Sequence, residues 1–123
     1  MASPEPAPAG GIVRTLLGEV APPTAEGETL SLWHYTIPAG QALAPHVHPG
    51  FQVARIVSGE LTYEVIEGDV TILRADGSTE TATTGATVTL DAGDTVIENP
   101  GLSHFGANNG TEPVIIYASS LLQ

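Results

Sequence analysis

The sequence predicts an all-β sandwich or barrel, and three observations support this class. Apolar residues recur in short runs rich in β-branched and aromatic side chains, and helical periodicity is nearly absent. Fourteen glycines and ten prolines interrupt the chain too often for long helices. The runs follow one another at near-regular spacing with turn residues between them. Roughly ten short strands arranged in this way are typical of a sandwich or a barrel.

The first two predicted strands cover residues 12–17 (IVRTLL) and 30–37 (LSLWHYTI). In the second strand, Trp33 and Tyr35 share one face and His34 lies on the other. The remaining predicted strands, in order, are 52–58, 60–66, 70–74, 79–83, 86–90, 94–98, 103–108 and 113–120. The stretches EGDV (67–70) and RADGST (74–79) are predicted hairpin turns, because Gly-Asp and Asp-Gly tolerate the positive φ that tight turns need.

Composition limits the classes of partner. The chain of 123 residues fits one domain. Its formal charge is -11, with 14 acidic residues, three arginines (Arg14, Arg55 and Arg74) and no lysine, which argues against binding nucleic acid or an anionic membrane. No apolar run approaches the roughly 20 residues of a membrane span. The absence of cysteine excludes disulfides, thiolate metal sites and thiol nucleophiles.

Residues 1–11 (MASPEPAPAGG) are predicted to form a flexible leader, and residues 12–123 a single domain. The leader has no positively charged opening and no apolar core, so it is not itself a signal peptide. Its Pro/Ala content and the acidic composition of the chain favour an exported, extracytoplasmic protein whose signal is not part of this sequence. A cytoplasmic location is the alternative.

The stretch APHVHPGFQVARIVSG (44–59) holds two of the four histidines. His46 and His48 point to the same face if the chain is extended there. Gln52 has the same parity, but four extended residues span about 13 Å, too far to share one ion with bonds of about 2.1 Å. A turn at Pro49-Gly50 solves this, because it places Gln52 on the next strand, facing the imidazoles.

A third imidazole is available from His104, which follows its own Pro-Gly pair. Three imidazoles and one amide oxygen can then converge on one metal ion. A lone H-x-H pair is equally compatible with two surface histidines. His34 has no such partner in the sequence and is expected to be structural or exposed. The sequence shows no Ser-His-Asp arrangement and no phosphate-binding loop, so no catalytic residue is assigned.

The glycines around these histidines resemble the cupin superfamily. Its first motif, G-x5-H-x-H-x3-E-x6-G, matches Gly40, His46, His48, Gln52 and Gly59 in every spacing, with glutamine in place of glutamate. The second motif, G-x5-P-x-G-x2-H-x3-N, matches residues 93–108, with the proline displaced by one position. The matched glycines, histidine and asparagine of the second motif are Gly93, Gly101, His104 and Asn108.

The resemblance implies a cupin-type jelly-roll β-barrel, also called a double-stranded β-helix. It implies one divalent transition metal (Fe, Cu, Ni, Mn, Zn or Co) bound by His46, His48, Gln52 and His104. It also implies a homodimer joined by sheet edges and N-terminal strands. The strand predicted at 12–17 can join the partner subunit in such a dimer, or it can close the barrel of its own chain.

The neutral glutamine leaves the ion with its full charge, so the site is expected to bind an anion. The resulting hypothesis is a metalloenzyme of the dioxygenase or isomerase type that acts on a small anionic molecule able to chelate the metal. The alternative is a non-catalytic module that binds or senses a metal or small ligand. Ala54 and Ile56 share the parity of Gln52, which predicts a mostly apolar pocket, whereas Arg55 faces away.

Overall fold

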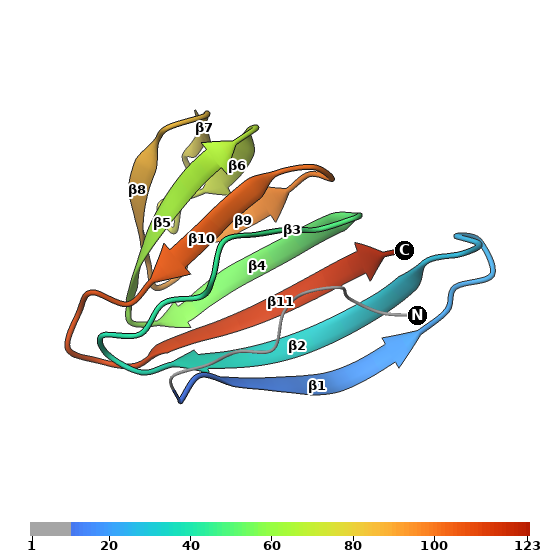
Figure 1. The fold of residues 1–123 in the computed structure, drawn as a ribbon, viewed down its shortest axis with the longest axis horizontal. Helices are drawn as coiled ribbons and strands as arrows, with labels where there is room; N and C mark the ends of the chain where they lie inside the picture. Colours follow the sequence, from blue (N-terminus) through green and yellow to red (C-terminus); the bar gives the residue numbers. More distant parts are fainter. Residues whose placement is uncertain (1–10) are drawn as a thin grey trace.

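In the computed structural model, which describes residues 11–123, all regular structure is β (Figure 1). The eleven strands are β1 (Val13–Val20), β2 (Thr29–Ile37), β3 (His46–Val47), β4 (Phe51–Ser58), β5 (Glu60–Glu67), β6 (Val70–Leu73), β7 (Thr79–Ala82), β8 (Thr87–Asp91), β9 (Thr95–Glu98), β10 (Ser103–Ala107) and β11 (Val114–Leu122). The predicted all-β class is confirmed. The predicted leader lies outside the described residues, apart from Gly11.

The strands form two antiparallel sheets. The larger sheet has the order β1-β2-β11-β4-β9-β6-β7, and the smaller one has the order β3-β10-β5-β8. Consecutive strands therefore alternate between sheets in several places, as β4 and β5 do. The two sheets enclose one interior, which gives the barrel its jelly-roll form (Figure 1).

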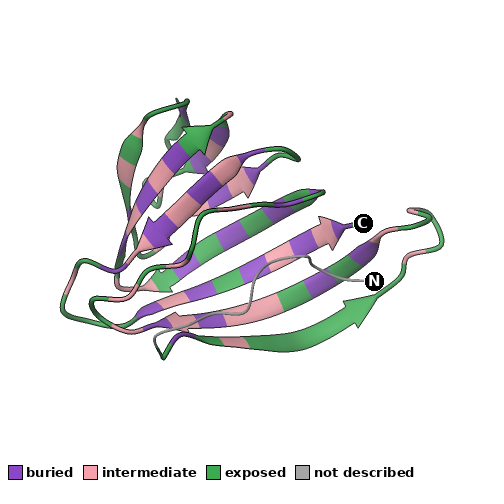
Figure 2. Cartoon of the chain, in the orientation of Figure 1, coloured by how far each residue is buried: buried purple, intermediate pink, exposed green. Residues whose placement is uncertain are grey.

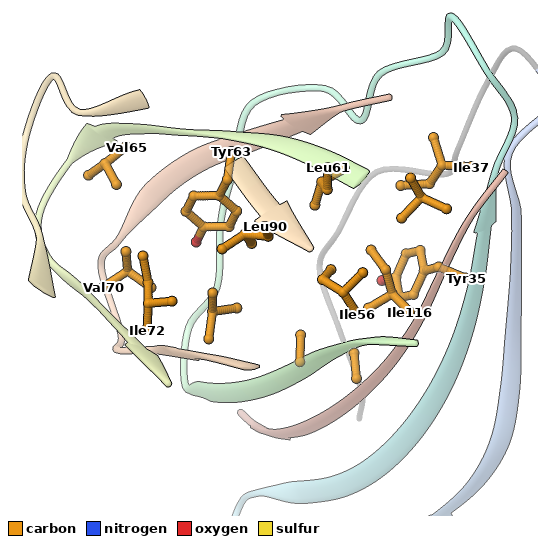
Figure 3. Close-up of a cluster of buried hydrophobic side chains, with 14 of the residues drawn as sticks. Tyr35, Ile37, Ile56, Leu61, Tyr63, Val65, Val70, Ile72, Leu90 and Ile116 are labelled. Carbon is orange, nitrogen blue, oxygen red and sulfur yellow. The ribbon is translucent and has the colours of Figure 1, made fainter. Parts of the chain in front are cut away.

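The core lies between the sheets, and alternation along each strand decides which side chains enter it (Figure 2). In β4, Gln52, Ala54 and Ile56 are buried, while Arg55 is exposed on the opposite face, as predicted. In β2, Tyr35 is buried as predicted, and Trp33 is half-buried and packs against the core. Figure 3 shows the apolar side chains of both sheets meeting in this interior, with the Tyr63 ring among them.

One of the two predicted hairpin turns is wrong. Residues 74–78 do connect the paired strands β6 and β7. Residues 67–70 do not form a hairpin, because β5 pairs with β10 and β8 whereas β6 pairs with β9 and β7. Gly68 does take a positive φ of 108°. Turn residues thus mark where the chain changes direction, but they do not reveal which sheet receives the next strand.

The strand predicted at 12–17 pairs with β2 of its own chain and forms an edge of the larger sheet. Nearly all residues of β1 are exposed (Figure 2). Among the described residues there is no helix of the length and apolarity needed to cross a membrane.

Candidate metal centre

A short strand and a tight turn position the two histidines of the first motif. In β3, His46 lies directly opposite His104 of β10. His48 follows, and after residues 49–50 the chain enters β4 at Phe51. A Cβ atom on Gly50 would lie 2.0 Å from the carbonyl oxygen of Leu121, so only glycine allows this turn to pass so close to β11. The predicted turn therefore exists, and it directs Gln52 back into the barrel.

The structure brings the three predicted histidines together. The ring centroids of His46 and His104 are 4.5 Å apart, and those of His46 and His48 are 4.9 Å apart. The Nε2 atoms of His48 and His104 are separated by 3.4 Å. One nitrogen from each of the three rings can be chosen so that all lie within 4.8 Å of one another. His48 and His104 are buried and His46 is half-buried, so a ligand can approach from the side of His46.

His34 lies elsewhere, as expected. It is on the opposite face of β2 from Tyr35, where its ring meets Tyr117 edge-on at a centroid distance of 5.0 Å. It therefore serves as a matched histidine outside the cluster.

The orientation of His46 suits a metal ligand. Its Nδ1 atom lies 2.7 Å from the carbonyl oxygen of Ala44. Because a carbonyl oxygen only accepts, Nδ1 carries the proton and donates it, and Nε2 keeps a lone pair. Metal-binding histidines in proteins are usually held by such a second hydrogen bond.

Gln52 lies beside the histidines, inside the barrel, and both ends of its amide are hydrogen-bonded. The amide nitrogen donates to Oε1 of Glu98 at 2.9 Å. The amide oxygen accepts from the hydroxyl of Ser120 at 2.7 Å. Metal binding by Gln52 and the three histidines stays a prediction.

Glu98 is a residue of the site that the sequence analysis missed. It closes β9 and is 1% exposed. Its Oε1 lies 3.4 Å from Nε2 of His48 and its Oε2 lies 3.3 Å from Nε2 of His104. The hydroxyl of Tyr63, on β5, donates to Oε2 at 2.5 Å. One signal was available: Glu98 shares the parity of Val96 in the predicted strand 94–98, and the alternation therefore turns it inward.

No lysine or arginine side chain pairs with Glu98. The chain has only three arginines and no lysine. Arg74 pairs with Asp94 and Glu80, and Arg14 lies over the ring of Trp33. Arg55 is exposed on the outer face of β4. Burial of a carboxylate costs its hydration, which the hydrogen bonds from Gln52 and Tyr63 replace only in part.

Burial and their mutual contact shift the pKa values of His104 and Glu98. Burial lowers the pKa of His104 to about 4, with His46 and His48 acting in the same direction against Glu98. Its imidazole is therefore neutral at pH 7. Burial raises the pKa of Glu98, but the charges of His104 and His48 and the hydrogen bonds from His48 and Tyr63 outweigh burial and lower the pKa to about 2.

A small cavity lies beside these groups. Its volume is about 40 Å³, which is room for two to four water molecules at roughly 10–15 Å³ each. His46, Gln52, Glu98 and His104 line one side of it. Most of the other lining side chains are apolar and include Ile56, Leu61, Val96 and Ile116. Imidazole and carboxylate donors fit a divalent transition ion, whereas Mg²⁺ and Ca²⁺ prefer sites built from oxygen alone.

Comparison with known proteins shows what the fold is similar to. No protein-family model matches the chain, and no curated protein matches it. The cupin 2 conserved barrel domain protein from Leptotrichia buccalis matches with a TM-score of 0.61 and 21% identity, over 93% of this chain and 42% of that chain. A structure of Rhodobacter sphaeroides SigE in complex with the anti-sigma ChrR gives a TM-score of 0.60 and 21% identity, over 91% of this chain and 46% of that one.

Oxalate oxidase in complex with the substrate analogue glycolate also has a TM-score of 0.60, with 22% identity over 97% of this chain and 52% of the oxidase chain. The chain thus spans about half, or less, of each of these proteins. At such low identity the likeness concerns the fold. The chain has the cupin fold that its two motifs predict.

Proposed function

We propose that this chain, with its cupin fold, binds one divalent transition metal through His46, His48 and His104 and presents it to a small organic ligand. The observation that carries the proposal is the convergence of three imidazoles beside a buried carboxylate with which no lysine or arginine pairs. When bound, such an ion supplies a Lewis acid with coordination positions that a ligand can occupy. Fe, Cu, Ni, Mn, Zn and Co all accept this kind of donor set.

The cavity limits the size of the ligand and the groups that can bind its charge. A volume of about 40 Å³ admits only a few non-hydrogen atoms. The lining has no lysine or arginine side chain, so the ion is the main positive charge available to an anionic group of the ligand. These features support a small anionic molecule that chelates the metal. One similar structure is oxalate oxidase with bound glycolate, a small carboxylate, and this supports the same class.

We extend the proposal to turnover of the dioxygenase or isomerase type. Tyr63 lines the cavity, and burial together with the charge of Glu98 raises the pKa of its phenol. The phenol therefore keeps its proton at pH 7 and holds it next to the ligand cavity. Most of the walls around the same space are apolar.

The alternative is a non-catalytic module that binds or senses a metal or small ligand. The narrowness of the cavity favours it, because little room remains for a substrate that must change shape. A similar structure that contains an anti-sigma protein also supports this alternative.

The first experiment measures metal content by elemental analysis of the purified protein. We expect about one transition-metal ion per chain in wild type, and loss of most of it in His104→Ala. His34→Ala is the matched control, since His34 lies outside the cluster, and it should keep the metal. Equal metal content in wild type and His104→Ala would contradict the proposed site.

A second experiment separates enzyme from sensor. The metal-loaded protein is mixed with oxalate or glycolate, and both binding and oxygen consumption or product formation are followed. Turnover that disappears in His104→Ala supports the enzyme, whereas saturable binding without turnover supports the sensor. Two further expectations remain proposals: a homodimer and an extracytoplasmic location.

A further inference from the structure

We infer that Glu98 is the carboxylate ligand of the proposed metal centre, and that Gln52 is a positioning residue that holds it. The first motif has its carboxylate ligand at the position of Gln52 on β4. In this chain the carboxylate ligand is then Glu98, on the neighbouring strand β9. The two residues are direct cross-strand partners, and both are buried inside the barrel. The inference rests on the proposed function, because it concerns the same ion.

The distances around Glu98 fit a shared ion. Donor atoms that are about 2.1 Å from one ion lie roughly 3.0–3.4 Å from each other at coordination angles of about 90–110°. The Nε2 atoms of His48 and His104 are 3.4 Å apart. Nε2 of His48 lies 3.4 Å from Oε1 of Glu98, and Nε2 of His104 lies 3.3 Å from Oε2. Each imidazole therefore has a ligand-like spacing to one of the two carboxylate oxygens, and an ion between the rings can be reached by the carboxylate through either oxygen.

The hydrogen bonds of Gln52 suit a supporting role. A carboxylate only accepts hydrogen bonds, so the side of the amide that faces Glu98 is its nitrogen, which donates. The amide oxygen points to Ser120 and accepts from its hydroxyl. Ser120 thus fixes the amide, and the amide fixes Oε1 of Glu98. In this arrangement the amide nitrogen of Gln52 is turned toward Glu98. An amide nitrogen that donates a hydrogen bond does not bind a metal ion.

Electrostatic repulsion explains why residue 52 is a glutamine rather than a glutamate if Glu98 is the ligand. A glutamate at position 52 beside Glu98 would bury two adjacent carboxylates, which repel one another in a medium of low dielectric. Glutamine has nearly the same shape and carries no charge. With Glu98 as ligand, the protein supplies one negative charge and three neutral imidazoles, the same total as the glutamate-containing motif.

The test compares Co²⁺ binding in four proteins: wild type, Glu98→Gln, the double exchange Gln52→Glu/Glu98→Gln, and Glu64→Gln. Affinity is measured by competition with a chelator, and the visible absorption of Co²⁺ reports the ligand set. Loss of residues that merely support a ligand costs about 10–100-fold in metal affinity. We expect Glu98→Gln to lose more than about 100-fold and to change the Co²⁺ spectrum.

The double exchange returns the carboxylate to β4 and should recover binding to within about tenfold of wild type. Glu64→Gln is the matched control, because this half-buried glutamate precedes Val65 on β5 and alternates away from Tyr63. It should leave affinity and spectrum unchanged. Circular dichroism first verifies that each variant is folded. If Glu98→Gln fails to fold, Glu98→Asp, which withdraws the carboxylate by one methylene, replaces it.

Wild-type affinity and an unchanged spectrum in Glu98→Gln would overturn the inference, and the proposed function would survive if His104→Ala still lost the metal. A double exchange that binds no better than Glu98→Gln would also overturn it. If wild type and His104→Ala bind Co²⁺ equally, the proposed function fails first, and this inference fails with it.

Discussion

At the residue scale, Tyr63 sets the position of the buried carboxylate from the side of the smaller sheet. Its hydroxyl donates to Glu98 at 2.5 Å, and its ring stacks on His104 with a centroid distance of 5.0 Å and an interplanar angle of 19°. Hydrogen bonds to a charged acceptor contribute about 1.5–3 kcal/mol to stability. Because no lysine or arginine pairs with Glu98, this bond and the one from Gln52 help to compensate its burial.

We predict that Tyr63→Phe lowers the free energy of unfolding of the metal-free protein by about 1.5–3 kcal/mol. The substitution keeps the ring that stacks on His104 and removes only the hydroxyl. Urea denaturation measures the change. Tyr117→Phe is the control, since Tyr117 is exposed, and it should stay within about 0.5 kcal/mol of wild type. A Tyr63→Phe protein as stable as wild type would show that the hydroxyl does little for Glu98.

The histidines of the site could be predicted from sequence, whereas for Glu98 the alternation predicts only that it turns inward, not that it joins the site. His46, His48 and His104 stand at the spacings of the two cupin motifs, and the resemblance to these motifs predicts their convergence. Glu98 ends a short strand just before Asn-Pro-Gly, a context that also suits a solvated acidic residue. What places it in the site is its register against Gln52, 46 residues earlier, and a single sequence does not contain that information.

At the element scale, the turn at residues 49–50 connects β3 to β4 and sets the approach of two site residues. It lies against the last residues of β11, where the carbonyl of Leu121 leaves no room for a Cβ atom on Gly50. An added methyl group must therefore move the turn away from β11. His48 and Gln52 stand two residues on either side of Gly50, so they move with it.

Gly50→Ala should destabilise the protein by about 1–3 kcal/mol or more, because a backbone carbonyl cannot yield as a side chain can. It should also weaken Co²⁺ binding. Thermal denaturation and chelator competition measure the two effects. Gly18→Ala is the control, because a Cβ atom there meets nothing within 4 Å and φ is not positive. Equal loss in both variants would indicate a general effect of replacing glycine in a strand.

Asp94 anchors the turn between β8 and β9, which precedes Glu98. It is 3% exposed and accepts hydrogen bonds from the backbone of Ala75 and Asp91 and from Arg74, at 2.8–2.9 Å. Burial raises its pKa, but these bonds outweigh burial and lower the pKa below its usual value. A carboxylate with a lowered folded-state pKa adds stability above its unfolded pKa of about 3.9 and loses it as the pH falls further.

Asp94→Asn should therefore cost about 1.5–3 kcal/mol at pH 7, because an amide nitrogen cannot accept from Arg74 or from the Asp91 backbone. The difference from wild type should shrink as the pH falls below about 4. Urea denaturation at several pH values measures it. Asp69→Asn, at an exposed position, is the control and should match wild type at each pH. A pH-independent difference would mean that the charge of Asp94 contributes nothing.

Most strands could be predicted, because alternation and turn residues are local signals. Each of the ten predicted strands overlaps an observed one, with ends that differ by a few residues. One observed strand, β3, is not among those predicted. It has two residues and is defined only by its pairing with β10. The incorrect hairpin at 67–70 has the same origin, since the sheet that accepts β6 is chosen by pairing with β9 and not by the turn.

At the scale of the whole molecule, the site joins the two sheets. His46, His104 and Tyr63 come from strands of the smaller sheet, and Gln52 and Glu98 come from the larger one. An ion held by residues of both sheets links them across the interior. Because the unfolded chain cannot present this set of ligands together, metal binding should stabilise the folded state.

The outer face of the larger sheet carries an apolar row across four neighbouring strands. Val20, Leu30, Leu121 and Phe51 are successive cross-strand partners on β1, β2, β11 and β4. Val20, Leu30 and Phe51 are 55%, 41% and 50% exposed. Side chains directly opposite each other on a sheet share one face, so the row is continuous. Apolar surface of this kind suits a second copy of the chain, which the predicted homodimer requires.

We predict that the protein elutes as a dimer, with twice the 12.6 kDa of one chain, in size exclusion with light scattering. Leu30→Glu places a charge in the middle of the row. In a symmetric dimer two copies of that charge lose water together, so the mass should fall to that of one chain while the thermal unfolding temperature of the monomer changes little.

Thr81→Glu adds the same charge to an exposed position on β7, at the opposite edge of the same sheet, and should remain dimeric. A wild-type mass of one chain at high concentration would contradict the dimer. If the Leu30→Glu protein stays dimeric, the dimer interface does not include this row. The exposed edge of β1 is then the next surface to alter.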